Sequence, residues 1–315
     1  METDLKETKK CNDLKFPKFE DNKVSTKTII AITNLTLDIN KLYLELPITP
    51  FIMNPKRRGR KRKHDIVDVN NNISSGSIIT VKFEDTIRGI DLKQKSKSVK
   101  KKNGKYFRNS ITIVMIINNK QINFKVSKNG KFQMTGCKTD EQAFDAIKFF
   151  WKYIYSFKET IYTFKNDSKH FTVIFIPAMR NIDFDLGFLV DREKLSKYIN
   201  LNTEYFSMLE ASFGYTGVNI KFPMNEDLVL LDVTKLEYIN DDWKQSIVPY
   251  TDHFDMISEK EKIKKINKPK FNTFLCFHSG KLIISGMTAE FMKDDYYKFL
   301  DIIRDCYTII QETLD

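Results

Sequence analysis

The sequence predicts an α+β fold built from two related halves. The strongest indication is a repeat with a period of 150 residues: GKFQMTG at 130–136 and GKLIISG at 280–286 share one pattern of glycine, lysine, alternating apolar residues and a final Thr/Ser-Gly pair. Each copy follows an apolar strand and precedes the longest amphipathic helix of its half, at about 140–157 and 289–312. With 41% hydrophobic residues, the 315-residue chain can form one large domain or two ordinary ones.

The first half is rich in β-branched residues, which favour strands. After the strand at 27–35, Asp38 is a suitable N-cap for a short helix at 37–46. The segment SITIVMII (110–117) is apolar almost throughout, so we expect it to be covered on both faces, the second cover being another layer of protein or a ligand. Further strands are predicted at 77–83, 121–126 and 131–136.

The second half repeats these kinds of element. We predict a helix at 191–199 and strands at 171–176, 181–190, 217–222, 271–277 and 281–286.

Positive charge is concentrated in two segments. Residues 55–64 hold seven Lys and Arg, residues 93–108 hold eight, and neither segment contains an acid. The whole chain carries +11, and removing these fifteen charges leaves −4. Such runs are usually solvated, and they attract phosphate nonspecifically, which favours nucleic acid or a related polyanion as partner.

Several classes are excluded by composition and spacing. No window approaches 18 consecutive apolar residues, and the polar start METDLKETKK lacks the apolar centre of a secretory signal. The four cysteines and four histidines show no metal-ligand spacing, so we expect no metal, no cofactor and a reducing compartment. No membrane or small-molecule partner is expected.

The repeated hairpins resemble those of the TATA-box-binding protein (TBP) family, whose SGK…TG motif precedes each long helix. The first copy is Ser127-Lys128-Asn129-Gly130-Lys131…Thr135-Gly136, aligned with one residue inserted, and the second is Phe277-His278-Ser279-Gly280-Lys281…Ser285-Gly286. The stretches CKTDEQ (137–142) and KPK (268–270) also look like that family's. The resemblance covers roughly residues 24–48, 77–157 and 171–313, and the long insertions suggest the divergent versions of large DNA viruses.

This resemblance implies a pseudo-twofold saddle, in which a curved antiparallel sheet carries its helices on the convex face. We expect a disordered tail at 1–23, a first repeat at 24–160 with insertions at 50–75 and 91–106, and a second repeat at 165–315 with an insertion at 224–268.

The implied function is that of a non-enzymatic basal transcription initiation factor, which binds promoter duplex in the minor groove and bends it. On this interpretation the second face of 110–117 covers the groove. Phenylalanine wedges are implied at the ends of the saddle, and the matching positions are Phe107, Phe213 and Phe277, with Val126 at an imperfect fourth position.

Basic residues near these wedges are our candidates for phosphate contacts: Lys97, Lys100, Lys101, Lys102, Lys105 and Arg108. A second basic group lies in the earlier insertion: Arg57, Arg58, Arg60, Lys61 and Arg62. The family implies a transcription factor IIB-like partner and RNA polymerase machinery, with Glu210 as a candidate contact.

The family also uses two central asparagines. Thr26 and Met179 align with them, and Asn34 and Asn181 lie nearby out of register, so the resemblance fixes no preference for TATA sequences.

Two other functions stay open. The fold could serve as a protein-interaction scaffold in a transcription complex with little DNA affinity of its own. A metal-dependent enzyme would use the only acidic cluster of note, Asp183, Asp185, Asp191 and Glu193. The segment 55–64 fits a nuclear import signal, a DNA-binding tether or the solubilising part of an insertion, and the sequence does not decide among them. We expect the protein in the nucleus, at a viral replication site in the host cytoplasm, or in the virion.

Overall fold

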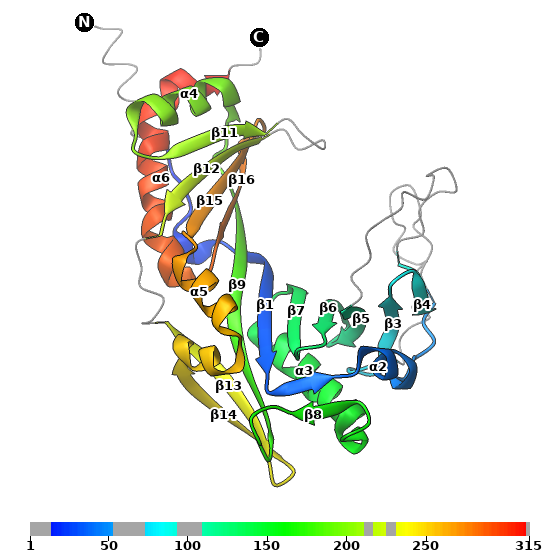
Figure 1. Cartoon of the computed structure of the whole chain (residues 1–315). Helices are drawn as coiled ribbons and strands as arrows, with labels where there is room; N and C mark the ends of the chain where they lie inside the picture. Colours follow the sequence, from blue (N-terminus) through cyan, green and yellow to red (C-terminus); the bar gives the residue numbers. More distant parts are fainter. Residues whose placement is uncertain (1–13, 53–72, 93–108, 211–216, 225–230, 313–315) are drawn as a thin grey trace, which may run out of the picture. The chain divides into compact units, whose positions relative to one another are not determined.

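The computed structural model describes residues 14–52, 73–92, 109–210, 217–224 and 231–312, in two compact units (Figure 1). The first-repeat unit comprises residues 28–176 and 232–256, and the second-repeat unit comprises the remainder. The division therefore falls inside two strands, and part of the predicted 224–268 insertion belongs to the first-repeat unit rather than to the second repeat.

The first-repeat unit is a sheet in the order β1-β7-β6-β5-β3-β4, in which all pairs from β7 to β4 are antiparallel. Its elements are β1 (Val24–Thr33), β2 (Leu35–Leu37), α2 (Ile39–Glu45), β3 (Ile78–Phe83), β4 (Thr86–Gly89), β5 (Ser110–Ile117), β6 (Lys120–Ser127), β7 (Lys131–Cys137), α3 (Asp140–Ile154), β8 (Tyr162–Phe164), β13 (Asp232–Ile239) and β14 (Asp242–Pro249).

The second-repeat unit has the matching order β9-β16-β15-β12-β11, all antiparallel. Its elements are β9 (Phe171–Asp185), of which the part from Pro177 belongs here, β10 (Leu189–Val190), α4 (Arg192–Asn202), β11 (Phe206–Glu210), β12 (Gly217–Pro223), α5 (Glu259–Asn267), β15 (Phe271–Phe277), β16 (Lys281–Gly286), α6 (Ala289–Ile310) and β17 (Gln311–Glu312). The predicted α+β class in two related halves is thus confirmed.

Equivalent hydrogen bonds tie β1 and β9, which we call the central strands, and the short strands β2 and β10 that follow them to the hairpin of each half. At the ends of the central strands, the N–H groups of Thr33 and Leu186 donate to the carbonyls of Gly130 and Gly280. The N–H of Leu37 donates to the carbonyl of Lys128, and the N–H of Val190 donates to that of His278. Asp38 and Asp191, the residues that follow, are the N-caps of α2 and α4, as predicted for Asp38. The central strands therefore correspond with an offset of 153 residues, because 190 is 37 plus 153 and 191 is 38 plus 153.

The repeated hairpins need glycine at the same turn position. Gly130 and Gly280 have φ of +69° and +79°, and a Cβ there would lie 2.3 Å from the carbonyl oxygen of Leu35 and 2.1 Å from that of Phe188. In both halves the glycine N–H donates to the residue three positions earlier, Ser127 or Phe277. The two turns therefore have equal lengths, and the one-residue insertion assumed in the sequence alignment is wrong.

The helices cover one face of each sheet. In the first-repeat unit α3 packs over β5 and β7, with Phe132 and Phe150 in edge contact at 4.9 Å. In the second-repeat unit α6 packs over β15 and β16, where Phe274 stacks on Phe299 at 4.3 Å. Figure 1 shows α4 and α6 beside the same group of strands. Burial of these aromatic side chains, together with the aliphatic residues around them, stabilises each unit.

Residues 14–23 are not the disordered tail that the sequence predicts. Phe19 is buried against Tyr296 of α6, with ring centroids 5.5 Å apart, and the Tyr296 hydroxyl donates to the carbonyl of Pro17 at 2.7 Å. The prediction of a disordered tail was wrong here because the segment is mostly polar and only Phe19 is buried in the core. The rest of the predicted tail lies outside the described residues.

The predicted 224–268 insertion contains regular structure that the sequence did not reveal. β13 pairs with the first part of β9, and β14 pairs with β13 through a turn at Asn240 and Asp241, both with positive φ. Trp243 anchors the hairpin by edge contact with Phe171 at 5.9 Å. Most β14 side chains are exposed, which explains the weak sequence signal.

Two neighbouring residues of β15 test whether its side chains alternate between the buried face and the exposed face of the sheet. We expect Phe274→Ala to lower the free energy of unfolding by about 3–5 kcal/mol, because its ring is fully buried. Leu275→Ala, on the opposite face, should cost about 1 kcal/mol or less. Urea unfolding measures both, and equal losses would contradict the assignment of faces.

Candidate nucleic-acid interface

The sheet of the second-repeat unit has one face away from its helices, which we call the open face. Ile182, Ile284 and Phe274 point into the core beneath α6, so their neighbours along each strand point the other way. The open face therefore carries Asn181, Asp183, Ile283, Ser285, Thr273, Leu275, Phe277, Asn219, Lys221, Met208 and Phe206.

Strand register arranges these residues in two rows. One row runs Phe206, Lys221, Thr273, Ser285, Asn181, and the other runs Met208, Asn219, Leu275, Ile283, Asp183. Phe206 and Met208 are 59% and 48% exposed at the outer strand. This combination of half-buried apolar and hydrogen-bonding side chains suits a surface that contacts both sugars and base edges.

Phe277 ends β15 at the hairpin turn, as the wedge prediction requires. Its ring is partly exposed, and its partner across the ladder is Gly217. A Cβ at Gly217 would lie 2.8 Å from the Leu275 side chain, so the glycine lets Leu275 pack directly over the backbone beside Phe277. Phe277 is thus positioned to contact a partner without leaving the sheet.

Two carboxylates belong to the open side of β9. Asp183 lies opposite Ile283, and Asp185 lies opposite Lys281. The hydroxyl of Ser25 donates to Asp183 at 2.9 Å, and the N–H of Gly187 donates to Asp185 at 2.9 Å. From the sequence alone, these two carboxylates are candidates for a metal site and not for this face of the sheet.

The equivalent face of the first-repeat unit is polar in its middle. Register brings Thr112, Lys125 and Gln133 into one row, and Asn123 and Thr135 into the next. Thr135 donates its hydroxyl to the carbonyl of Asn123 at 3.2 Å. On β6 and β7 this face therefore offers exposed side chains that can form hydrogen bonds.

Further out, this face is covered by the chain itself. Ile79, Val114 and Ile116 form a small buried cluster separate from the main core. Phe51, Ile73 and Leu92 pack against it. Of the two covers considered for 110–117, the structure has a protein layer, so the prediction that this end of β5 faces a minor groove is wrong.

Val126 is not a wedge. It is fully buried in the main core, between Ile111 and Phe132 across the ladder. The turn geometry makes Ser127 the counterpart of Phe277, and its hydroxyl donates to Asn129 Oδ1 at 2.6 Å. The first hairpin therefore presents a small polar side chain where the second presents an aromatic one.

Most of the other predicted contacts lie outside the described residues. These are Phe107, Phe213, Lys97, Lys100, Lys101, Lys102, Lys105, Arg108, Arg57, Arg58, Arg60, Lys61 and Arg62. Glu210 is the last residue of β11, where its backbone pairs with Gly217.

The asparagines near the expected central positions have different environments. Asn34 is buried, accepting from the N–H of Thr172 at 3.0 Å and donating to the carbonyl of His170 at 2.8 Å, which makes it structural. Asn181 lies on the open face opposite Ser285. Met179, the aligned residue, precedes the paired stretch, so Asn181 is the better candidate for a central contact.

The acidic cluster does not form a metal site among the described residues, where no group of three or more His, Cys, Asp or Glu side chains could hold an ion. Asp191 caps α4 by accepting from the N–H of Lys194 at 3.0 Å. That backbone hydrogen bond is the main cause that lowers the pKa of Asp191.

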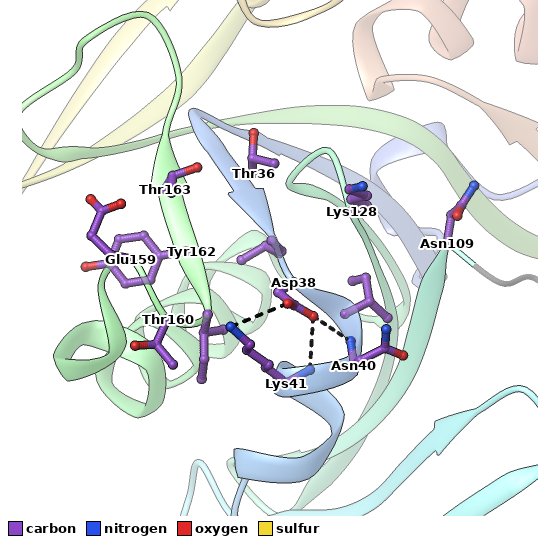
Figure 2. Close-up of a pocket in the computed structure, with 13 residues that line it drawn as sticks. Thr36, Asp38, Asn40, Lys41, Asn109, Lys128, Glu159, Thr160, Tyr162 and Thr163 are labelled. Atoms are coloured by element: carbon purple, nitrogen blue, oxygen red, sulfur yellow. Dashed lines mark hydrogen bonds and ion pairs between the residues drawn. The ribbon is translucent and has the colours of Figure 1, made fainter.

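An open hollow of about 430 Å³ borders α2 and β8 of the first-repeat unit. Figure 2 shows its polar side chains, with Asp38 accepting from the N–H groups of Asn40 and Lys41, both at 3.1 Å. Burial is the main cause that raises the pKa of Tyr162, which also lines the hollow, to about 12. The central carboxylate thus serves as a helix cap.

The family model described as "Transcription factor TFIID (or TATA-binding protein, TBP)" matches residues 78–157, from β3 to the 3₁₀ turn after α3. A protein described as "TATA-box-binding protein-like" from Acanthamoeba polyphaga mimivirus is 35% identical over 150 residues, which is 40% of each chain. The chain is therefore similar to TBP-like proteins over part of its length, including the first of its two hairpins.

The chain is also similar to "Uncharacterized protein 335L" of Invertebrate iridescent virus 6, with 25% identity over 226 residues, which is 68% of this chain. The chain spans 65% of the length of that relative and 40% of the mimivirus protein. Among solved structures, Methanococcus jannaschii TBP matches 92% of this chain and 99% of its own, with 13% identity and a TM-score of 0.42. No helix within the described ranges is long and apolar enough to span a membrane.

The covered cluster on β5 yields a stability prediction. Ile116→Ala should lower the free energy of unfolding by roughly 2–4 kcal/mol, because Ile116 is only 6% exposed. Thr112→Ala, two rows along the same face, is the matched control and should cost about 1 kcal/mol or less. A negligible effect of Ile116→Ala in urea unfolding would mean that the cluster is not a packed core.

Proposed function

We propose that this protein binds duplex DNA through the open face of its second-repeat unit, in the minor groove, and acts as a transcription initiation factor. The observation that carries the proposal is Phe277, a partly exposed aromatic ring two residues beyond the half-buried Leu275 on the same face of β15. Apolar wedges of this kind unstack a base step and bend the duplex toward the major groove.

The other side chains of this face have chemistry that suits a groove. Lys221 lies 5.8 Å from the ring centroid of Phe271, and Asn181, Thr273 and Ser285 offer hydrogen-bonding groups in one row. The minor groove presents a few acceptors and the guanine amino donor. The basic segments 55–64 and 93–108 add sequence-independent attraction to phosphate.

We expect bending to be asymmetric. Ser127, the counterpart of Phe277 in the first repeat, cannot wedge a base step, so the kink from these hairpins should fall at the end contacted by the second repeat. The remaining wedge candidates, Phe107 and Phe213, are part of this proposal on sequence grounds.

The bend prediction uses fluorescence end-to-end distances on a selected duplex. Phe277→Ala should reduce the bend, and adding Phe213→Ala should reduce it further, because each change removes a wedge. Ile309→Ala, an exposed apolar residue on α6, is the control and should leave the bend unchanged. If the phenylalanine variants bend the duplex as much as the wild type does, Phe277 and Phe213 are not wedges.

Salt dependence tests the basic insertion. Replacing Lys97, Lys100, Lys101 and Lys102 with glutamine should weaken binding across all sequences. It should also reduce the slope of log K against log salt by about 0.9 for each phosphate that these lysines neutralise in the wild type. Titration at several salt concentrations measures this, and an unchanged slope would exclude this segment from the interface.

A scaffold function is the second candidate, favoured by the covered β5 cluster and by the carboxylates on the open face. It predicts no duplex binding beyond that of the isolated basic segments. Both candidate functions agree with a transcription factor IIB-like partner contacted through Glu210 and with RNA polymerase machinery. Both also agree with a location in the nucleus or at a viral replication site.

A further inference from the structure

Asp183 occupies an unusual place for an acidic residue. It lies on the open side of β9, next in its row to Ile283 and Leu275, and it is exposed. The hydroxyl of Ser25 donates to its Oδ1 at 2.9 Å. No Lys or Arg in the described parts of the chain forms an ion pair with it. A carboxylate held this way keeps acceptor capacity directed away from the core.

The first repeat has an apolar residue at the equivalent place. With the offset of 153 residues between the central strands, Asp183 corresponds to Ile30, which is partly buried on β1. The same offset pairs Asn181 with Thr28. The two repeats therefore present different chemistry at corresponding positions, with a carboxylate in the second repeat and an aliphatic side chain in the first.

We infer that Asp183 is a specificity-determining residue, which selects a G·C pair in the part of the minor groove contacted by the second repeat. This inference rests on the proposed DNA-binding function. The floor of the groove offers acceptors at every base pair, and its only hydrogen-bond donor is the exocyclic amino group of guanine.

An ionised carboxylate only accepts hydrogen bonds. Against an A·T pair, Asp183 would lose water and face adenine N3 or thymine O2, which donate nothing, so the buried charge would stay unpaired. Against a G·C pair it accepts from the amino group. We therefore predict that the protein prefers G·C over A·T at the base pair that Asp183 contacts, whereas a surface that reads only A·T pairs would prefer A·T.

Neighbouring residues support a base contact. Ser285, in the adjacent row, can donate and accept, which suits the groove beside the pair, whereas the Oδ1 atom of Asn181 is buried. Asp185, the other carboxylate, accepts from the N–H of Gly187 and lies opposite Lys281 at the hairpin end. Asp183 is therefore the carboxylate placed within the rows of the open face.

The experiment compares the wild-type protein with Asp183→Ile, which installs the first-repeat residue, and with Asp183→Asn. Duplexes are selected from a random pool, and the G·C pair that the wild type enriches is then rebuilt with inosine, which lacks only the minor-groove amino group. We expect inosine to weaken wild-type binding about tenfold or more and to leave Asp183→Ile unaffected, with a selected preference shifted toward A·T.

Asp294→Asn, an exposed change on α6 with the same loss of charge, controls for net charge and should retain the wild-type response to inosine. Circular dichroism and urea unfolding establish that each variant is folded. Ser25→Ala, which removes the orienting hydroxyl, should reduce the inosine effect while leaving binding to other sequences in place.

The outcomes separate the two proposals. Wild-type binding that is insensitive to inosine, or an Asp183→Ile variant that binds every sequence more tightly by one common factor, overturns the guanine contact and leaves DNA binding intact. Failure of the folded wild type to bind any duplex overturns the proposed function and this inference with it.

Discussion

Side chains on an antiparallel strand alternate between two faces, and in both repeats a long helix occupies one of them. Once Phe274 and Ile284 are buried beneath α6, the residues between them are fixed on the other side. The register across β16, β15 and β12 then aligns these residues into rows. The composition of the exposed rows, and so any surface that this protein offers to a partner, follows from the helix packing.

The sequence was sufficient for the elements with strong periodicity. Helices α3 and α6 follow from the spacing of their apolar residues. The turns at Gly130 and Gly280 and the Asp38 cap follow from local rules, because a positive φ or an unpaired N–H group at a helix start restricts the residue type. The sequence did not predict β13 and β14, because apolar and polar residues do not alternate along these two strands. Phe19 escaped because one buried ring does not form a pattern.

The candidate site was harder to predict than the fold. Val126 was chosen by counting back from an assumed insertion, and a one-residue error in a strand moves a side chain to the opposite face. The apolar character of β5 was recognised, but its cover comes from Phe51, Ile73 and Leu92, at the ends of segments with no visible pattern. Phe277, by contrast, lies where the matched hairpin implied.

The placement of β13 and β14 determines whether the two units can be separated by cutting the chain. Residues 232–256 lie in the chain between β12 and β15 of the second copy, yet they complete the unit that contains the first copy. Neither unit is therefore a continuous stretch of sequence. A chain ending at residue 176 would lack residues 232–256 of the first-repeat unit, so no single cut yields two complete units.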